Sequence, residues 1–299
     1  MKRYLSPSVI AQIGRLDLVA RMVVEGTLAG EHKSRFHGFN IEFAEHRQYF
    51  PGDELKHIDW KLYAKSDRYY VKQYEENTSL RAYILLDCSH SMAYPEEAGA
   101  SALTKLMYAR YLAAALAYLT LHQGDSVGIV TFSDHVRQTV APRSHPSHLE
   151  RILGAVDRNE AAERTDFFRI FQEFSGHIKR RALVIVLSDF FDEYDRIMQG
   201  VKFLKFLKHE LILLHVLTPQ EIDFPFEDYT NFIDMESGSN LWIDPRIIRE
   251  KYKSAMQQYI HRLSQECRYR HIDYALFRTD QPFEVNLARF LAMRARRRI

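Results

Sequence analysis

The residues of this sequence best suited to chemistry are Asp87, Ser89 and Ser91, which form the pattern Asp-x-Ser-x-Ser. They directly follow residues 83–86, a short apolar run rich in side chains that favour strands. A run that is apolar on both faces is typical of a central strand covered by helices on either side. The three oxygen-bearing side chains therefore leave the end of a strand and can converge on one cation. The same pattern also fits a polar turn that caps the following helix.

Two later residues fit the same edge of a sheet. Thr165 opens a predicted helix, and Asp189 ends a second apolar strand at 182–188. Open α/β sheets place their ligands at the carboxyl ends of parallel strands. Ligand sets made only of oxygen suit Mg²⁺ or Mn²⁺, and Mg²⁺ keeps several of its waters. The sequence thus predicts a site for Mg²⁺ (or Mn²⁺), with Ca²⁺ left open, formed by Asp87, Ser89, Ser91, Thr165 and Asp189.

Helices and strands alternate after this motif, as expected for an α/β domain. Predicted helices cover residues 98–122, 146–157, 166–179, 193–208, 245–266 and 283–297. Predicted strands cover residues 126–132, 136–141, 182–188, 210–217 and 271–277, with short strands around Phe232 and Trp242. The strand at 136–141 follows its neighbour after a short turn, so it should be antiparallel. We expect a doubly wound, mostly parallel six-stranded sheet with one antiparallel edge strand and helices on both faces.

The length of 299 residues predicts one large domain with a smaller one attached. We assign residues 1–79 to an N-terminal helix and a small α+β lobe, and residues 80–299 to the large domain. Apolar residues recur at helical spacing within residues 1–28, and Phe39, Ile41 and Phe43 alternate with polar residues as in a half-buried strand.

The small lobe carries a charged motif around a turn. It consists of Arg47, Tyr49, Pro51, Gly52, Asp53, Asp59 and Trp60. Proline followed by glycine fits the central positions of a type II turn. We expect Arg47, Asp53 and Asp59 to form an ion-paired cluster with Trp60 packed behind it. Either these charges join the two lobes, or Arg47 or Asp53 faces the nucleotide site of a partner.

Composition restricts the location and the partners of the protein. The net charge of +2 gives no argument for nucleic acid as a partner. Two cysteines, Cys88 and Cys267, suit a reducing compartment, and Cys88 is expected to be a buried thiol. The sequence contains no apolar run of membrane-spanning length and no signal segment, so we expect a cytoplasmic protein. Arginines near the C-terminus, from Arg294 to Arg298, either oppose a helix dipole or form a patch for RNA or anionic lipid.

An ordered set of motifs between about residues 26 and 190 resembles the bacterial family called domain of unknown function fifty-eight. The set comprises Glu42-Phe43, Arg47-x-Tyr49-x-Pro51-Gly52-Asp53, Ile58-Asp59-Trp60, Ala64 and Leu86-Asp87-x-Ser89-x-Ser91-Met92. Lys56 stands where that family often has arginine. The order Asp-x-Ser-x-Ser, Thr, Asp is also similar to the metal-ion-dependent adhesion site of von Willebrand factor A domains. The resemblance implies a von Willebrand A-like module and, as a partner, the MoxR-type AAA+ ATPase beside which family members are typically encoded.

We therefore expect a non-enzymatic, metal-dependent interaction module, which the resemblance makes an adaptor for a MoxR-type ATPase. The partner, this ATPase or its client protein, would bind through an acidic side chain. The sequence lacks a phosphate-binding Gly-x-x-x-x-Gly-Lys-Ser/Thr loop, a Gly-x-Ser-x-Gly elbow and a His-Glu-x-x-His motif. The alternative is a magnesium-dependent phosphoryl or ester hydrolase at the same edge, with His90 and Asp166 as the nearby candidate bases.

Overall fold

The computed structural model describes residues 4–5, 41–48, 60, 63, 69–76, 80–95, 103–158, 165–178, 180–233 and 239–296. Only the backbone is described for residues 41–48 and 70–76. The chain forms two compact units. The larger unit consists of Met1–Thr27 and Leu80–Ile299, and the smaller one of Leu28–Ser79.

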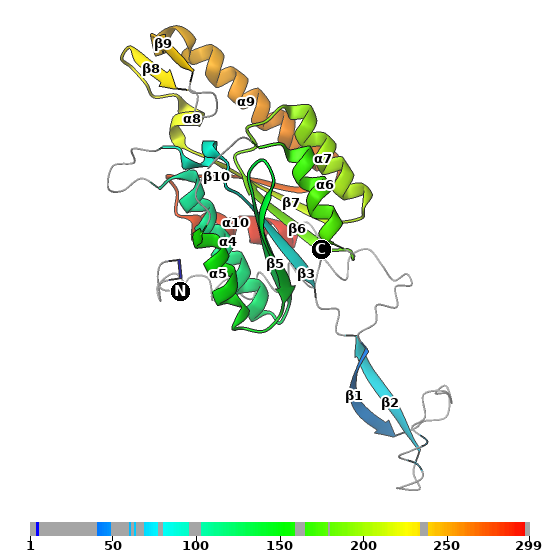
Figure 1. The fold of residues 1–299 in the computed structure, drawn as a ribbon. Helices are drawn as coiled ribbons and strands as arrows, with labels where there is room; N and C mark the ends of the chain where they lie inside the picture. The colour runs from blue at the N-terminus through cyan, green and yellow to red at the C-terminus, as the bar shows by residue number, and fades with distance from the viewer. Residues whose placement is uncertain are drawn as a thin grey trace. The chain divides into compact units, whose positions relative to one another are not determined.

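A six-stranded sheet forms the centre of the larger unit, with the strand order β10-β7-β6-β3-β4-β5 (Figure 1). The strands are β3 (Arg81–Asp87), β4 (Ser126–Phe132), β5 (Val136–Arg143), β6 (Leu183–Ser188), β7 (Glu210–Leu217) and β10 (Asp273–Arg278). Neighbouring strands are parallel except for β5, which pairs antiparallel with β4 at one edge. The prediction of a mostly parallel α/β sheet with one antiparallel edge strand is confirmed.

Side chains of the central strand alternate between two hydrophobic cores, because successive residues of a strand point to opposite faces. Ala82, Ile84 and Leu86 of β3 belong to one core, and Tyr83 and Leu85 belong to the other. The first core is completed by α4 (Lys105–His122), α5 (His148–Arg158) and α10 (Phe283–Arg296). The second is completed by α6 (Phe167–His177), α7 (Tyr194–Phe206) and α9 (Pro245–Tyr269). Helices therefore cover both faces of the sheet, as predicted.

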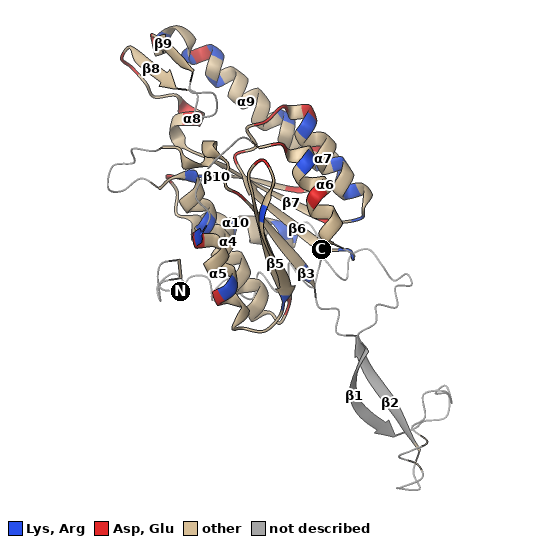
Figure 2. Ribbon diagram, in the orientation of Figure 1, with Lys and Arg blue, Asp and Glu red and all other residues tan. Residues whose placement is uncertain are grey.

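A short insertion lies between β7 and α9. It consists of α8 (Pro219–Asp223) and a hairpin of β8 (Thr230–Ile233) and β9 (Asn240–Ile243). The hairpin extends from the sheet beside the first turns of α9 (Figure 1). Lys and Arg are interspersed with Asp and Glu along α6, α7 and α9 (Figure 2). These helices therefore carry charges of both signs.

The long buried helix begins later than predicted. Thr104 has an extended backbone and its hydroxyl accepts a hydrogen bond from the amide of Met107, so α4 starts at Lys105 and not at residue 98. The threonine side chain satisfies an amide of the first turn, which fixes the start of the helix.

The N-terminal residues that the structure describes belong to the core of the larger unit. Tyr4 and Leu5 are buried in its first core, and the Tyr4 hydroxyl donates a hydrogen bond to Asp157. The predicted N-terminal helix otherwise lies outside the described residues. In the smaller unit, β1 (Ile41–Gln48) pairs antiparallel with β2 (Tyr70–Glu76).

Candidate functional site

Three carboxylates follow neighbouring parallel strands at one edge of the sheet. Asp87 is the last residue of β3, Asp189 follows β6, and Glu221 lies in α8 directly after β7. The pairing of Leu86 with Leu187 aligns the ends of β3 and β6, and β7 is the next strand. The carboxyl edge therefore gathers acidic groups from segments that are far apart in the sequence.

Asp87 is buried, with 1% of its surface exposed. Its Oδ1 accepts a hydrogen bond from the amide of Ser89 at 2.8 Å, and its Oδ2 accepts one from the hydroxyl of Ser188 at 2.6 Å. The hydroxyl of Thr165 lies 3.5 Å from Oδ1. Within the described part of the chain, no Lys or Arg forms an ion pair with this carboxylate. Asp87 is thus a buried acidic group surrounded by neutral donors.

The two serines of the motif lie together. The Oγ atoms of Ser89 and Ser91 are 3.1 Å apart. Ser89 precedes the short 3₁₀ helix η2 (His90–Ala93), but its side chain makes no capping hydrogen bond to that helix. The alternative that the serine caps the following helix is therefore wrong for Ser89. Its hydroxyl faces Ser91 instead.

Thr165 does not itself open the helix that follows it. Asp166 is the N-cap of α6, since its Oδ1 accepts a hydrogen bond from the amide of Arg169 at 3.0 Å. Thr165 stands one residue earlier, and its hydroxyl is directed at Asp87. The sequence thus predicted the position of Thr165 at this edge, but assigned it the structural role that Asp166 has.

A buried lysine joins the other two carboxylates. The Nζ of Lys105, at the start of α4, lies 2.7 Å from Oδ2 of Asp189 and 2.5 Å from Oε1 of Glu221. The ammonium also lies over the ring of Phe191, 4.7 Å from its centroid. Burial alone would lower the pKa of Lys105, but the charges of Asp189 and Glu221 outweigh it and raise that pKa. Lys105 is therefore charged at neutral pH.

The turn after β6 holds this network in place. Phe190 has a positive φ of 51°, a conformation that costs a residue with a Cβ about 1 to 2 kcal/mol. Its amide donates to the hydroxyl of Ser188 at 2.8 Å, and its carbonyl accepts a hydrogen bond from the hydroxyl of Tyr259. The buried ring stacks on Phe167. These contacts offset the strain and fix the backbone of Phe190. Its chain neighbours Asp189 and Phe191 are thereby held beside Lys105.

Among the described residues, Lys105 is the one cation that pairs with the acidic groups of this edge. Burial, and then the neighbouring charge of Asp189, raise the pKa of Asp87 to about 7. The edge thus gathers three carboxyl groups and one ammonium, which pairs with Asp189 and Glu221. Ionisation of Asp87 would add a negative charge beside the hydroxyls of Ser89 and Ser91.

The donor set fits a hard divalent cation. Asp87, Ser89, Ser91 and Thr165 offer one carboxylate and three hydroxyls, and Mg²⁺ and Mn²⁺ prefer oxygen ligands. The described residues contain no group of three or more His, Cys, Asp or Glu that suits a metal, so an ion here would depend on hydroxyls and water. Asp189 is held by Lys105 and by the amide of Phe191, so it would reach such an ion through water.

Sequence reasoning missed Lys105 and Glu221. Lys105 belongs to a helix that is apolar almost all round, and a lysine buried there requires an acidic partner. Glu221 belongs to the capping box that begins at Thr218, a pattern that is readable in the sequence. Cys88, by contrast, is the buried thiol that was predicted, and burial raises its pKa to about 12.

The motif of the smaller unit is described only in part. Arg47 lies in β1 opposite Val71, whereas Tyr49, Asp53 and Asp59, with the Pro51-Gly52 turn, lie outside the described residues. Trp60 is 57% exposed and contacts Tyr63 edge to face, with the ring centroids 6.2 Å apart. The expectation that Trp60 packs behind the turn stays a prediction, because the turn lies outside the described residues.

The arginine-rich C-terminus is partly structural. Arg294 is buried and lies 2.7 Å from Asp273 and 3.7 Å from Glu210. This arginine is thus not available to a ligand at the surface. Among the helices that the structure describes, none is long and apolar enough to cross a membrane.

Comparisons with known proteins place the chain among proteins without an assigned function. Residues 45–262 match the family model described as "Protein of unknown function DUF58". An uncharacterized protein of Mycobacterium tuberculosis (strain ATCC 25618 / H37Rv) is 24% identical over 297 residues, which cover 97% of this chain and 91% of that protein.

Two of the solved structures to which the chain is similar come from species of Bacteroides. The conserved hypothetical protein BatB of Bacteroides thetaiotaomicron is 13% identical, with a TM-score of 0.47 over 73% of this chain and 100% of that chain. An aerotolerance-related membrane protein of Bacteroides fragilis is 14% identical, with a TM-score of 0.40 over the same shares.

Proposed function

Because the chain belongs to the DUF58 family, whose function is unknown, we propose a function from the geometry of the carboxyl edge. The protein is a metal-dependent protein–protein interaction module that performs no chemistry of its own. Asp87, Ser89, Ser91 and Thr165 bind Mg²⁺ or Mn²⁺, with Asp189 acting through water.

One observation carries this proposal: the carboxylate of Asp87 is buried without an ion pair in the described part of the chain. Keeping such a buried carboxyl ionised costs free energy unless it is paired or coordinates a metal, which is why burial raises its pKa to about 7. Lys105 does not relieve this cost, because its hydrogen bonds go to Asp189 and Glu221. A divalent cation beside Asp87 would offset the excess negative charge of the edge.

The ligand types explain how a bound ion would recognise a partner. Ser89, Ser91 and Thr165 contribute neutral oxygens, so the ion would keep most of its charge. An incompletely neutralised cation attracts a further carboxylate. We therefore propose that an acidic side chain of the partner completes the coordination, as the resemblance to the von Willebrand A metal-ion-dependent adhesion site implies.

The proposed partner is a MoxR-type AAA+ ATPase or its client. The support is the ordered set of family motifs, from Glu42 to Met92, which joins the small-unit motif to the metal motif in one chain. In this arrangement the protein is an adaptor in a reducing compartment, consistent with the free thiols of Cys88 and Cys267.

Affinity capture with the full chain tests the proposal. The tagged protein is incubated with the purified MoxR-type ATPase of its own host, with Mg²⁺ or with EDTA. We expect capture with Mg²⁺, and at least a tenfold loss with EDTA or in Asp87→Asn. Lys202→Met, which changes an exposed residue of α7, is the matched control and should bind like the wild type. If the amount of captured ATPase is the same with EDTA and in Asp87→Asn as in the wild type with Mg²⁺, the proposal is contradicted.

A further inference from the structure

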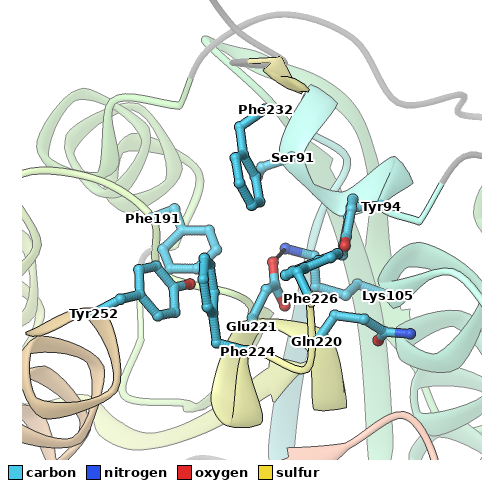
Figure 3. A pocket seen from close by; sticks show the side chains of 10 residues that line it. All are labelled: Ser91, Tyr94, Lys105, Phe191, Gln220, Glu221, Phe224, Phe226, Phe232 and Tyr252. Carbon is cyan, nitrogen blue, oxygen red and sulfur yellow. Dashed lines mark hydrogen bonds and ion pairs between the residues drawn. The ribbon is translucent and has the colours of Figure 1, made fainter. Parts of the chain in front are cut away.

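An aromatic pocket of about 360 Å³ opens beside the candidate metal edge (Figure 3). Its walls come from η2 and the residue after it, from the start of α4, from the turn after β6, from α8, from β8 and the segment that leads into it, and from α9. Six aromatic side chains line it: Tyr94, Phe191, Phe224, Phe226, Phe232 and Tyr252. The volume is at the lower end of the range of about 300 to 1,000 Å³ for ligand pockets, and suits one or two side chains.

The charged groups of the pocket are already paired with each other. Lys105 binds Glu221 and Asp189, and the second oxygen of Glu221 accepts hydrogen bonds from the amide and the hydroxyl of Thr218 at 2.8 and 2.9 Å. Because Lys105 and Glu221 are paired with each other, neither group offers an uncompensated charge to a cationic ligand. An anionic ligand would have to displace Glu221 from Lys105. The pocket therefore favours an uncharged, apolar occupant.

Ser91 connects the pocket with the metal edge. It is one of the residues that line the pocket (Figure 3). Its hydroxyl lies 3.1 Å from that of Ser89. A partner segment whose carboxylate reaches an ion at the serines would therefore have its neighbouring side chain at the mouth of the pocket.

We propose that this pocket binds an aromatic or branched aliphatic side chain of the partner, next to the carboxylate that completes the metal site. The inference rests on the proposed function and adds a second recognition element to it. The carboxylate alone would not distinguish one acidic surface from another. The apolar side chain supplies specificity, since burying one such group strengthens binding by roughly tenfold to a hundredfold.

Fluorine NMR with the full chain tests the pocket separately from the metal. One probe is para-fluorophenylbutyrate, which carries a ring and a carboxylate, and the second is the corresponding alcohol. Phe232→Ser removes a wall of the pocket, and Trp242→Ser is the matched control, because Trp242 lies on the paired strand, is 61% exposed and does not line the pocket. Phe226→Ser is a second pocket variant, and thermal unfolding shows that each variant is folded.

We expect the butyrate to bind the wild type and Trp242→Ser with Mg²⁺, and to bind Phe232→Ser and Phe226→Ser at least tenfold more weakly. The alcohol should bind more weakly than the butyrate, should not respond to Mg²⁺, and should be equally sensitive to the two pocket variants. Equal binding of both probes by the wild type and by both pocket variants would overturn the inference.

Two further outcomes separate the alternatives. If the pocket variants weaken both probes but Mg²⁺ changes neither, the pocket is supported and the proposed metal-dependent function is overturned. A para-fluorobenzyl trimethylammonium probe that binds more tightly than the alcohol would overturn the assignment of a neutral occupant, because aromatic cages also bind quaternary ammonium groups.

Discussion

The ammonium of Lys105 lies 2.7 Å from the carboxylate of Asp189, whereas Asp87, at the end of the neighbouring strand, accepts hydrogen bonds only from neutral donors in the described structure. The two strand-terminal aspartates are therefore not equivalent. Among the described residues, Asp189 has a cationic partner and Asp87 has none. In the proposed function, Asp87 would therefore bind the cation directly and Asp189 would support it through water.

Replacing the lysine tests this division. Lys105→Met leaves Asp189 and Glu221 without their buried partner, which typically costs about 3 to 5 kcal/mol of unfolding free energy. We expect a clearly lower thermal midpoint in EDTA, and a larger rise of that midpoint on adding Mg²⁺ than in the wild type. Thermal unfolding with and without Mg²⁺ measures both effects. Lys202→Met is the control, and a Lys105→Met midpoint as high as that of Lys202→Met would contradict the buried network.

The absence of catalysis is a second expectation. Asp166, one of the two candidate bases near the edge, accepts a hydrogen bond from Arg169 as the cap of α6 and so has a structural role. With Mg²⁺ present, the purified protein should hydrolyse neither ATP nor generic phosphate and carboxyl esters above the buffer rate. Turnover that disappears in Asp189→Ala, in protein shown to be folded, would instead support a hydrolase.

A third prediction concerns pH and lies away from the metal edge. Burial raises the pKa of Asp125 from 3.8 to about 6, although the amide of Leu80 donates a hydrogen bond to its Oδ1 at 2.8 Å. The folded state therefore binds this proton more tightly than the unfolded state does. Protonation of Asp125 therefore adds to the free energy of unfolding. This contribution is fully present below about pH 4 and is lost as the pH rises through 6.

Asp125→Asn keeps the acceptor for Leu80 and removes the titration. We expect the variant to be more stable than the wild type at pH 7.5, by at most about 3 kcal/mol, and to lose most of that advantage near pH 4. Urea unfolding at the two pH values gives the difference. An advantage that stays constant between them would show that the carboxyl of Asp125 does not titrate in this range.

The sheet and its order of elements could be predicted because the strands are short runs that are apolar on both faces. The bounds of β4 and β7 agree with the prediction residue for residue. Buried strands of this kind leave a strong local signal, and the carboxyl edge follows once the strands are known to be parallel. Ser89, Ser91 and Asp189 could be placed at that edge for the same reason, since each follows a strand of the sheet.

The ion network and the pocket could not be predicted in this way. Lys105 and Asp189 are 84 residues apart in the sequence, and Lys105 and Glu221 are 116 apart. Their contact depends on how α4 and α8 pack on the sheet, which no local pattern reports. The pocket also depends on the hairpin after α8. Phe232 and Trp242 are both aromatic residues of its short strands, but Phe232 lines the pocket and Trp242 is exposed.

Titration calorimetry of Mg²⁺ and Mn²⁺ into the full chain tests the central claim most directly. We predict one site with a dissociation constant of about 10⁻⁵ to 10⁻³ M, because few charged ligands are present, and a loss of that site in Asp87→Asn and Ser89→Ala. Asp125→Asn, which changes a buried aspartate outside the edge, should bind like the wild type. Equal binding by the wild type, Asp87→Asn and Ser89→Ala, or no binding by the folded wild type, would contradict the assignment.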